Sequence, residues 1–484
     1  SDVATRSNVI QLVDHRGAPM ARYDAGSVSR RTAGWLASRG TGPNREIAAD
    51  LSTVLDRSRD LARNNPWARR AIGAIVNNWV GSGIRAQWAS ARRQKRWTGW
   101  FESTDIDADG RLDGYGLQSL IARAVVESGS ALIRKRPRRM TDSYSIPLQI
   151  QVLEPDWIDR AKNDFTIDGG YIVQGIQFNA LGQRTHYWLY PEHPGDQTHR
   201  HSMISQPKPA DEFLHVYRID RPGQVHGMPW ATGAYLRLRM LDDLHDAVLE
   251  RQRQSACFMA FVRDIEPGDA TQSTGTLVEK FEPGLIEILP PGKSIEFADP
   301  PDAPNHKDLE TAVLLAVAAD YGIPYEVMTG DLSRVNFSSA RMGFQEFGRS
   351  IESWRWQLFA PQFLTPLVGW YLEAEAVAGY TGRPEVPLWT APARQIVDPA
   401  REIPAIRDAV RSGLMSLPQA IRAMGFDPAV LVQEHADFLA VLDKLGVAFD
   451  SDGRHATSGP SEQKAVEKDP DSQIQQDDAD EADQ

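Results

Sequence analysis

The first regular pattern of apolar positions is helical and begins at Glu46. Its apolar side carries Leu51, Val54, Leu55, Ser58 and Leu61. The pattern predicts a helix that ends at Asn64, because Asn65 can cap the next helix and Pro66 suits its first position. That second helix ends at the turn 81–83, and its apolar face consists of Trp67, Ala71, Ile72, Ile75, Val76 and Trp79.

The pattern changes from helix to strand at Ser130. Two amphipathic stretches, 93–102 and 117–126, predict helices before this point. From 130 to 221 short β-runs alternate with Pro, Gly and Asn or Asp clusters. The runs read ALIRKR, PLQIQVLE, YIVQGIQF and THYWLY. Helices followed by short strands indicate an α+β domain.

A long uninterrupted pattern follows. The segment between Gly233 and Pro267 contains neither glycine nor proline, and it predicts a helix of roughly 28 residues, about 42 Å long. Two short β-candidates, 285–289 and 294–297, are bounded by prolines and glycines, and a second helix returns over 306–321. This order predicts an antiparallel helical hairpin with a small β-rich tip.

The C-terminal third is helical again. An apolar seam begins after the sequence NFSS and consists of Ala340, Phe344, Phe347, Ile351, Trp354 and Leu358, which we expect in the core. Beyond Pro392, proline and glycine delimit three shorter helices. These open at Asp398-Pro399, Ser416-Leu-Pro418 and Asp427-Pro428 and close at Gly413, Gly425 and Gly446. These helix boundaries predict a small helical unit.

Composition limits the classes of protein that fit. A chain of 484 residues, 41% hydrophobic, predicts two or more packed units or one extended subunit. The single Cys257 excludes a disulfide framework and a cysteine zinc cage, and indicates a reducing cytosol. Apolar runs such as 312–319 are too short to span a membrane, and the polar first residues do not resemble a signal peptide.

Charge is concentrated at one end. The formal net charge is −12, and residues 451–484 hold ten acids and three bases, a net charge of −7. The first 450 residues are therefore mildly acidic, with 55 acids and 50 bases. The acidic tail has almost no large apolar residue and is expected to be disordered, serving solubility or docking. Residues 1–45 are expected to form a flexible arm.

Residues 105–113, DIDADGRLD, resemble the start of an EF-hand calcium loop. The acids Asp105, Asp107 and Asp109 and the glycine Gly110 fit loop positions 1, 3, 5 and 6. An EF-hand also needs a bidentate Glu at position 12, which falls here on Gly116. We interpret the stretch as a helix-to-helix turn, with calcium binding through 105–116 as an alternative.

No catalytic motif is evident. The chain lacks a phosphate-binding loop of the G-x-x-x-x-G-K type, a G-x-S-x-G elbow and an H-E-x-x-H zinc motif. Glu154 and Asp156 are a conceivable metal-dependent nuclease pair, although a turn after a strand explains them more simply. The histidines His193, His199 and His201 lie near Asp196 in a loop that we interpret as an exposed linker rather than a metal site. The basic run 134–139 could contact DNA, but the exposed face of a strand is the simpler interpretation.

Six short motifs occur in a recognisable order. They are DLARNNPWAR (60–69), VGSGIR (80–85), DADGRL (107–112), QVLEPD (151–156), RPGQVHGMPW (221–230) with the following LDD (241–243), and NFSSAR (336–341). In this order the chain resembles the portal proteins of lambda-type tailed bacteriophages over about 45–445. Each motif alone is weak, and the order makes the resemblance specific.

The resemblance implies a ring, usually of twelve subunits, at one vertex of the capsid. Its subunits have wing, stem, clip and crown parts. On this chain the implied parts are a flexible arm (1–45), a wing (46–230), a first stem helix (231–263), a clip (264–305), a second stem helix (306–322), a tunnel loop with the start of the seam helix (323–348), a wing return (349–393), a helical crown (394–450) and a disordered acidic tail (451–484).

The resemblance also implies sites and partners. In the tunnel loop, Ser333, Arg334 and Asn336 would meet passing double-stranded DNA through weak, exchangeable contacts, or would brace the loop against a neighbouring subunit. At the clip, a docking set would comprise Lys293, Glu296 and Asp299. Partners would be other copies of the chain, the large terminase subunit that hydrolyses ATP, the head-tail adaptor, and the major capsid or scaffolding protein. The expected location is the virion after assembly in the host cytoplasm, with no enzymatic activity, cofactor, metal or membrane.

Overall fold

The computed structural model describes residues 41–142, 144–196, 202–256, 260–264, 293–297, 306–333, 337–393, 398–447 and 449. These residues form two compact units. The first unit contains residues 41–84 and 88–387, and the second contains 85–87 and 388–449. Within the described ranges, no helix has the length and apolar character needed to cross a membrane.

Four helices open the first unit. They are α1 (Pro43–Asn64), α2 (Pro66–Trp79), α3 (Ala91–Phe101) and α4 (Gly114–Ser128). The predicted boundary at Asn65 is confirmed, because its Oδ1 accepts a hydrogen bond from the Ala68 N–H at 2.9 Å. Ser90 and Asp113 cap α3 and α4 in the same way. Short polar side chains thus set where these helices begin.

Two antiparallel sheets follow. The three-stranded sheet has the order β3-β2-β9, with β2 Ser130–Pro137, β3 Leu148–Leu153 and β9 Phe213–Tyr217. The five-stranded sheet is a meander of β4 (Asp164–Phe165), β5 (Tyr171–Val173), β6 (Ile176–Phe178), β7 (Arg184–Leu189) and β8 (Gln206–Pro209). Single 3₁₀ turns occur at Thr104–Ile106, Met140–Asp142, Pro155–Trp157, Ala210–Glu212 and Thr232–Ala234. The predicted α+β class is confirmed.

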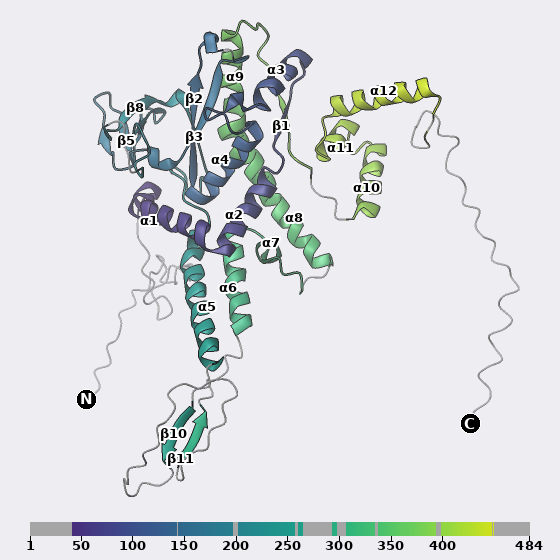
Figure 1. Ribbon diagram of the computed structural model, residues 1–484. Helices are drawn as coiled ribbons and strands as arrows, with labels where there is room; N and C mark the ends of the chain where they lie inside the picture. The colour runs from purple at the N-terminus through teal and green to yellow at the C-terminus, as the bar shows by residue number, and fades with distance from the viewer. Residues whose placement is uncertain are drawn as a thin grey trace, which may run out of the picture. The chain divides into compact units, whose positions relative to one another are not determined.

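The three-stranded sheet is covered on both faces. Side chains on a strand alternate between faces. Leu132 of β2 belongs to a buried cluster with Phe213 of β9 and residues of the meander such as Tyr187. Ala131 and Ile133 point the other way and are fully buried, where α4 and α9 (Thr365–Val377) contact the sheet (Figure 1). The strand is therefore apolar on both faces over this stretch.

The apolar seam predicted over 340–358 does not continue as one α-helix. Helix α8 (Phe337–Ser353) passes into a π-helix (Trp354–Leu364), and α9 (Thr365–Val377) follows directly. Pro361 lies inside the π-helix, and because proline has no N–H and crowds the preceding turn, wider winding relieves the conflict. Phe344, which we expected in the core, is 48% exposed, so this part of the core prediction was wrong.

Tryptophans join the π-helix to α2. The rings of Trp79 and Trp230 stack with centroids 5.7 Å apart, and the ring of Trp354 lies 4.8 Å from that of Trp230. The buried Arg355 donates to the backbone carbonyls of Asn78 and Trp79 at 2.8 and 2.7 Å. A cation here satisfies carbonyls at the C-terminal end of α2, where the helix dipole is negative.

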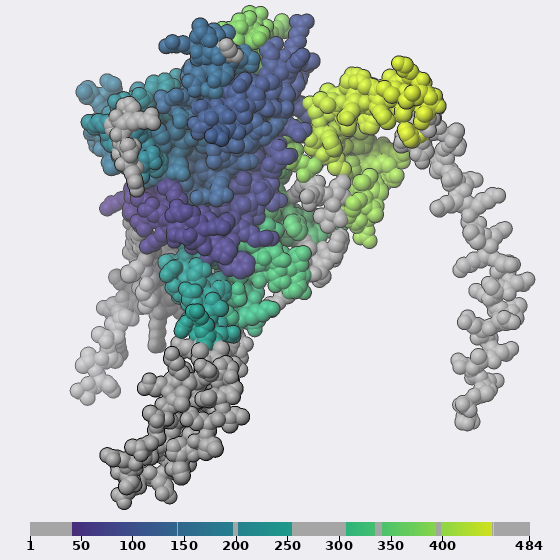
Figure 2. All heavy atoms as spheres, in the orientation of Figure 1, coloured from purple at the N-terminus to yellow at the C-terminus, as the bar shows by residue number. Residues whose placement is uncertain are grey.

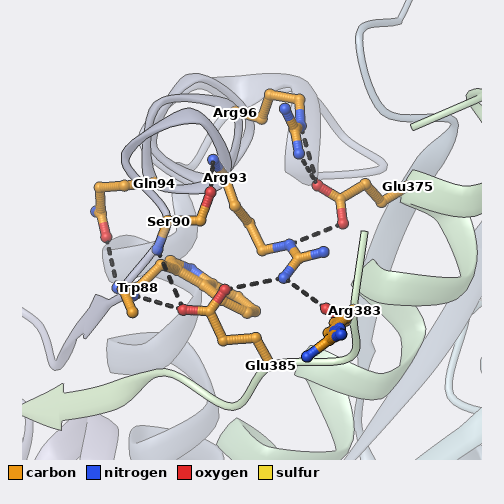
Figure 3. A network of polar contacts seen from close by, with 9 residues as sticks. Trp88, Ser90, Arg93, Gln94, Arg96, Glu375, Arg383 and Glu385 are labelled. Carbon is orange, nitrogen blue, oxygen red and sulfur yellow. Dashed lines mark hydrogen bonds and ion pairs between the residues drawn. The ribbon is translucent and has the colours of Figure 1, made fainter. Parts of the chain in front are cut away.

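A buried charge network joins α3 to a second segment, which comprises the end of α9 and the residues that follow it (Figure 3). Arg93 Nε donates to Glu375 Oε2 at 3.0 Å, and Arg93 Nη1 donates to Glu385 Oε2 at 3.0 Å. Arg96 Nε donates to the other oxygen of Glu375 at 2.9 Å. Glu385 also accepts from the Ser90 N–H at the start of α3. Removing one partner would leave a buried charge uncompensated, so the network fixes how the two segments pack.

Two helices of the first unit form an antiparallel pair. Helices α5 (Tyr235–Ala256) and α6 (His306–Tyr321) lie side by side (Figure 1). Between them in the chain, β10 (Ala260–Asp264) pairs antiparallel with β11 (Lys293–Phe297). The sequence predicted helix through residue 263, and this was wrong for 260–263, where pairing with β11 decides the conformation. The β-candidate 285–289 lies outside the described residues.

The second unit is small and mainly helical. Strands β1 (Arg85–Gln87) and β12 (Leu388–Thr390) pair antiparallel. Three helices follow, α10 (Pro399–Arg411), α11 (Leu417–Ala423) and α12 (Pro428–Leu445). Gly413, Gly425 and Gly446 have φ of 74°, 78° and 66°, the left-handed conformation that ends helices at low cost for glycine. The predicted boundaries of these three helices are confirmed.

Candidate functional site

The predicted tunnel segment begins after a short helix. Helix α7 (Tyr325–Thr329) ends at Gly330, whose φ is 75°, and Ser333 is the one residue of the predicted DNA-contacting set that the structure describes. The side chain of Ser333 is exposed, and its backbone N–H donates to Asp331 Oδ1 at 2.9 Å. Arg334 and Asn336 lie outside the described residues.

The start of this segment is held against α2. Arg70 Nε donates to the Val327 carbonyl at 3.1 Å, and a Cβ added at Gly330 would lie 3.1 Å from Arg70 Nη2. A pocket of about 640 Å³ opens here, and Asn77, Leu332 and the exposed Phe344 are among the residues that line it. The segment therefore begins where a hydrogen bond holds α7 against α2.

The predicted docking residues lie on and beside β11. In the antiparallel pair, Lys293 lies opposite Asp264 and Glu296 opposite Phe261. Asp299 lies outside the described residues.

The pair α5–α6 buries one side and exposes apolar residues on others. Leu238 and Leu241 of α5 are buried, whereas Leu236 and Met240 on the opposite side are 67% and 69% exposed. Leu309 and Leu315 of α6 are also exposed. Asn65 anchors the pair, because its Nδ2 donates to Asp242 of α5 at 3.0 Å while its Oδ1 caps α2.

The second unit has a much larger share of uncovered apolar side chains. Of the described residues of its three helices, Ala420 and Leu442 are the buried ones. On α12, Val430, Phe438, Val441 and Leu445 recur at i, i+8, i+11 and i+15 and share about a quarter of the helix circumference. These four residues, here called the α12 stripe, are 52–68% exposed, and Figure 2 shows α12 at the surface of its unit.

Comparison with known proteins agrees with the order of motifs. Residues 28–355 match the family model described as phage portal protein, lambda family. The chain belongs to the lambda family of phage portal proteins. The probable portal protein of Halomonas phage phiHAP-1 is 23% identical over 435 residues, covering 83% of this chain and 82% of that protein.

More distant similarities include a second portal protein and a solved structure. Portal protein B of Escherichia phage lambda is 22% identical over 336 residues, which cover 60% of this chain and 62% of that protein. Among solved structures, the neck of the native gene transfer agent particle, determined with C12 symmetry, aligns with a TM-score of 0.46 and 13% identity. That alignment covers 77% of this chain and 94% of the other.

The EF-hand-like stretch of this portal-family chain is a backbone turn. Asp107 Oδ1 accepts from the Asp109 N–H at 3.1 Å, and Asp107 Oδ2 accepts from Arg111 and Leu112 at 2.9 and 3.0 Å. Asp113 caps α4. Both oxygens of the central carboxylate are thus used by the backbone, which confirms the interpretation as a turn between helices.

The proposed nuclease pair is neutralised by arginines. Arg59 donates to both Glu154 and Asp156, and Arg160 also pairs with Asp156. Burial alone would raise the pKa of Asp156, but the hydrogen bond and charge of Arg59 outweigh it and hold that pKa below its usual value. Both carboxylates of the pair are therefore bound by arginine side chains in this structure.

The histidine loop and the basic run, which we interpreted from the sequence as exposed, are partly buried in the structure. His193 is not an exposed linker residue, because its Nε2 lies 3.1 Å from Glu154 Oε2 and its side chain is half-buried. His199 and His201 lie outside the described residues. In the basic run, Lys135 pairs with Glu373 and Arg134 lies over the ring of Phe213. These two strand residues are half-buried because they hold neighbouring elements together.

Sequence reasoning missed two groupings. The α12 stripe was detectable from the spacing of Phe438, Val441 and Leu445. The second grouping is His306 and Glu310 at helical spacing on α6 with His245 on α5, which together form no contiguous sequence motif. The partner His245 is 61 positions away from His306, so only the packing of α5 against α6 shows that they meet.

Proposed function

We propose that this chain is the subunit of a portal ring at one capsid vertex, through which double-stranded DNA enters and leaves. Membership of the portal family supports the class of function. The uncovered apolar surface of the second unit is the main support for assembly, because contact with a neighbouring chain would bury it. A ring of about twelve copies is the closed symmetric form that the family resemblance implies.

The α12 stripe is the main element of the proposed interface. Burial of apolar surface stabilises a protein by roughly 25 cal/mol for each Å² removed from water. Exposed apolar residues lack this stabilisation. A neighbouring copy offers the same unit in the next position around the ring. Burial of the stripe between adjacent copies would therefore stabilise both the ring and the helices that carry it. The exposed leucines of α5 and α6 would add contacts in the same way.

The proposed channel works by weak contact with DNA. Each cation fixed on a phosphate releases counterions and adds affinity, so many such contacts in one ring would slow DNA movement. A mildly acidic chain suits a conduit of low friction. In this proposal Ser333, Arg334 and Asn336 lie at the channel and make exchangeable contacts, while the hydrogen bond that holds α7 against α2 keeps the start of the segment in place.

The β10–β11 end of the hairpin is the proposed docking end. Lys293, Glu296 and Asp299 would meet the large terminase subunit during packaging and the head-tail adaptor afterwards. The outer part of the ring would contact the major capsid or scaffolding protein, and the finished ring would stay in the virion. The chain is structural in this proposal, and the energy for packaging comes from ATP hydrolysis by the terminase.

The decisive experiment measures assembly of the full chain. Light scattering followed by negative-stain imaging, at neutral pH and moderate salt, is expected to show annular particles of about twelve subunits. Val441→Glu places a charge in the stripe and should abolish or strongly reduce the rings, because an unpaired charge in an apolar contact costs several kcal/mol.

Ala436→Glu is the matched control, because Ala436 is exposed on the opposite side of α12 and receives the same new charge. It should assemble like the parent chain. A compact dimer or monomer of the parent chain under every condition, including the presence of a scaffolding protein, would refute the ring. Rings that tolerate Val441→Glu would refute the assigned interface.

A further inference from the structure

A mixed histidine and carboxylate group bridges the two helices of the α5–α6 pair. His245 lies on α5, and His306 and Glu310 lie one turn apart on α6. His245 Nε2 lies 3.4 Å from Glu310 Oε1, and the ring centroids of His245 and His306 are 5.7 Å apart. One potential ligand atom from each residue falls within a mutual distance of 4.8 Å.

We propose that His245, His306 and Glu310 form a binding site for a divalent transition-metal ion of the zinc type. Two imidazoles and one carboxylate are a ligand set that suits Zn²⁺, Co²⁺ and Ni²⁺ rather than Mg²⁺ or Ca²⁺, which prefer oxygen. Three protein ligands leave a fourth position for water. The half-buried side chains of this site give water access to that position.

The geometry fits a small tetrahedral ion. Ligand atoms bound at about 2.0–2.1 Å in a tetrahedron lie roughly 3.3 Å from one another. The observed 3.4 Å between His245 Nε2 and Glu310 Oε1 is close to this value. Spacing of i and i+4 puts His306 and Glu310 on the same face of α6, so His306 lies beside the His245–Glu310 pair.

The second His and carboxylate group of the chain shows why this site differs. Glu154, Asp156 and His193 also lie within ligand distance of one another. Their charge is already compensated by Arg59 and Arg160. In the described part of the chain, no Lys or Arg forms an ion pair with Glu310. The α5–α6 group therefore has the ligands without a resident cation, and Glu154–His193 serves as an internal comparison.

A bound ion would act as a clamp between the helices. Its ligands come from both α5 and α6, so a sliding of one helix along the other by a turn, about 5.4 Å, would break the coordination. Metal binding would thus fix the register of the pair close to the start of α6. The site lies within one chain, so the inference goes beyond the proposed ring and does not depend on it.

The test titrates the full chain, freed of metal with a chelator, with Zn²⁺ by calorimetry and with Co²⁺ by visible absorption. One saturable ion per chain is expected, with the intense absorption of four-coordinate Co²⁺ and a rise in melting temperature on addition of Zn²⁺. His245→Gln and Glu310→Gln should each weaken binding by more than the ~10–100-fold that loss of an outer-shell partner causes.

Two variants control for binding elsewhere. His193→Gln alters the arginine-compensated group, and His435→Gln removes an exposed histidine of α12. Both should bind like the parent chain. Absence of saturable binding, or equal affinity in His245→Gln, Glu310→Gln and the parent, would overturn the proposal. Circular dichroism of the two ligand variants without metal should match the parent, which separates loss of the site from loss of the fold.

Discussion

The two units of the chain differ in how far their apolar side chains are buried. The first unit covers its three-stranded sheet on both faces and packs several of its tryptophans against one another. Trp79, Trp100 and Trp230 are at most 1% exposed. In the second unit the four residues of the α12 stripe are more than half exposed, although its helices carry well-formed caps at Ser416 and Asp427.

This difference shows that helix caps and the packing of apolar side chains have separate effects. Caps decide where a helix starts and stops, but each contributes only about 1 kcal/mol. Most of the stability of a helix in a protein comes from burial of its apolar face. The first unit has this burial within a single chain. The second unit has the local signals without the burial, as expected of a part that completes its core with a neighbour.

The largest effect on this comparison is expected from Trp100→Ala. Trp100 is fully buried, its ring contacts those of Trp97, Phe101 and Tyr371, and its Nε1 donates to the Leu148 carbonyl at 2.8 Å. Truncation leaves a cavity and an unpaired carbonyl, and should lower the free energy of unfolding of the first unit by about 4 kcal/mol. Urea unfolding monitored by fluorescence measures it, and a loss below ~1 kcal/mol would contradict a self-sufficient core.

A second effect should appear as the pH falls. His226 is buried, which lowers its pKa from 6.5 to about 4 despite the hydrogen bond of Nε2 with the Gln174 carbonyl oxygen. Burial, with the charge of Arg184, also lowers the pKa of the adjacent His215. Between pH 6.5 and 4, His226 becomes protonated in the unfolded chain but stays neutral in the folded chain. The free energy of unfolding therefore decreases as the pH falls through this window.

For His226 the loss amounts to about 3 kcal/mol by pH 4, because each unit of pKa shift corresponds to about 1.4 kcal/mol. Urea unfolding of the first unit at several pH values measures the slope. His226→Gln should remove the share of His226 and so reduce the slope. An unchanged slope in His226→Gln would show that other groups cause the acid sensitivity.

The smallest effect on the separate chain is expected from Phe438→Ala. Phe438 belongs to the α12 stripe and is 54% exposed, so its removal should change the unfolding free energy of the unassembled chain by less than ~0.5 kcal/mol. In assembled particles the same change should lower the concentration at which rings persist, as followed by light scattering against dilution. A large loss in the unassembled chain would mean that Phe438 packs within its own subunit.

Local signals in the chain predicted much of the fold. The breaks at Asn65-Pro66, Asp398-Pro399 and Gly446 are correct because a cap, a proline or a left-handed glycine acts within one helical turn. Prediction failed where contacts with residues far away in the chain decide the conformation or the burial of a residue. Residues 260–264 form a strand through pairing with β11, and Phe344 is exposed although it continues the apolar seam.

By itself the sequence determined the family, the α+β class and the boundaries of many helices, because motifs and caps act over short stretches of chain. Only the tertiary structure decided which of the polar side chains meet. Arg59 neutralises Asp156, Arg93 joins Glu375, and His245 reaches Glu310 across 65 positions. Such contacts depend on the packing of whole elements, and no local spacing encodes them.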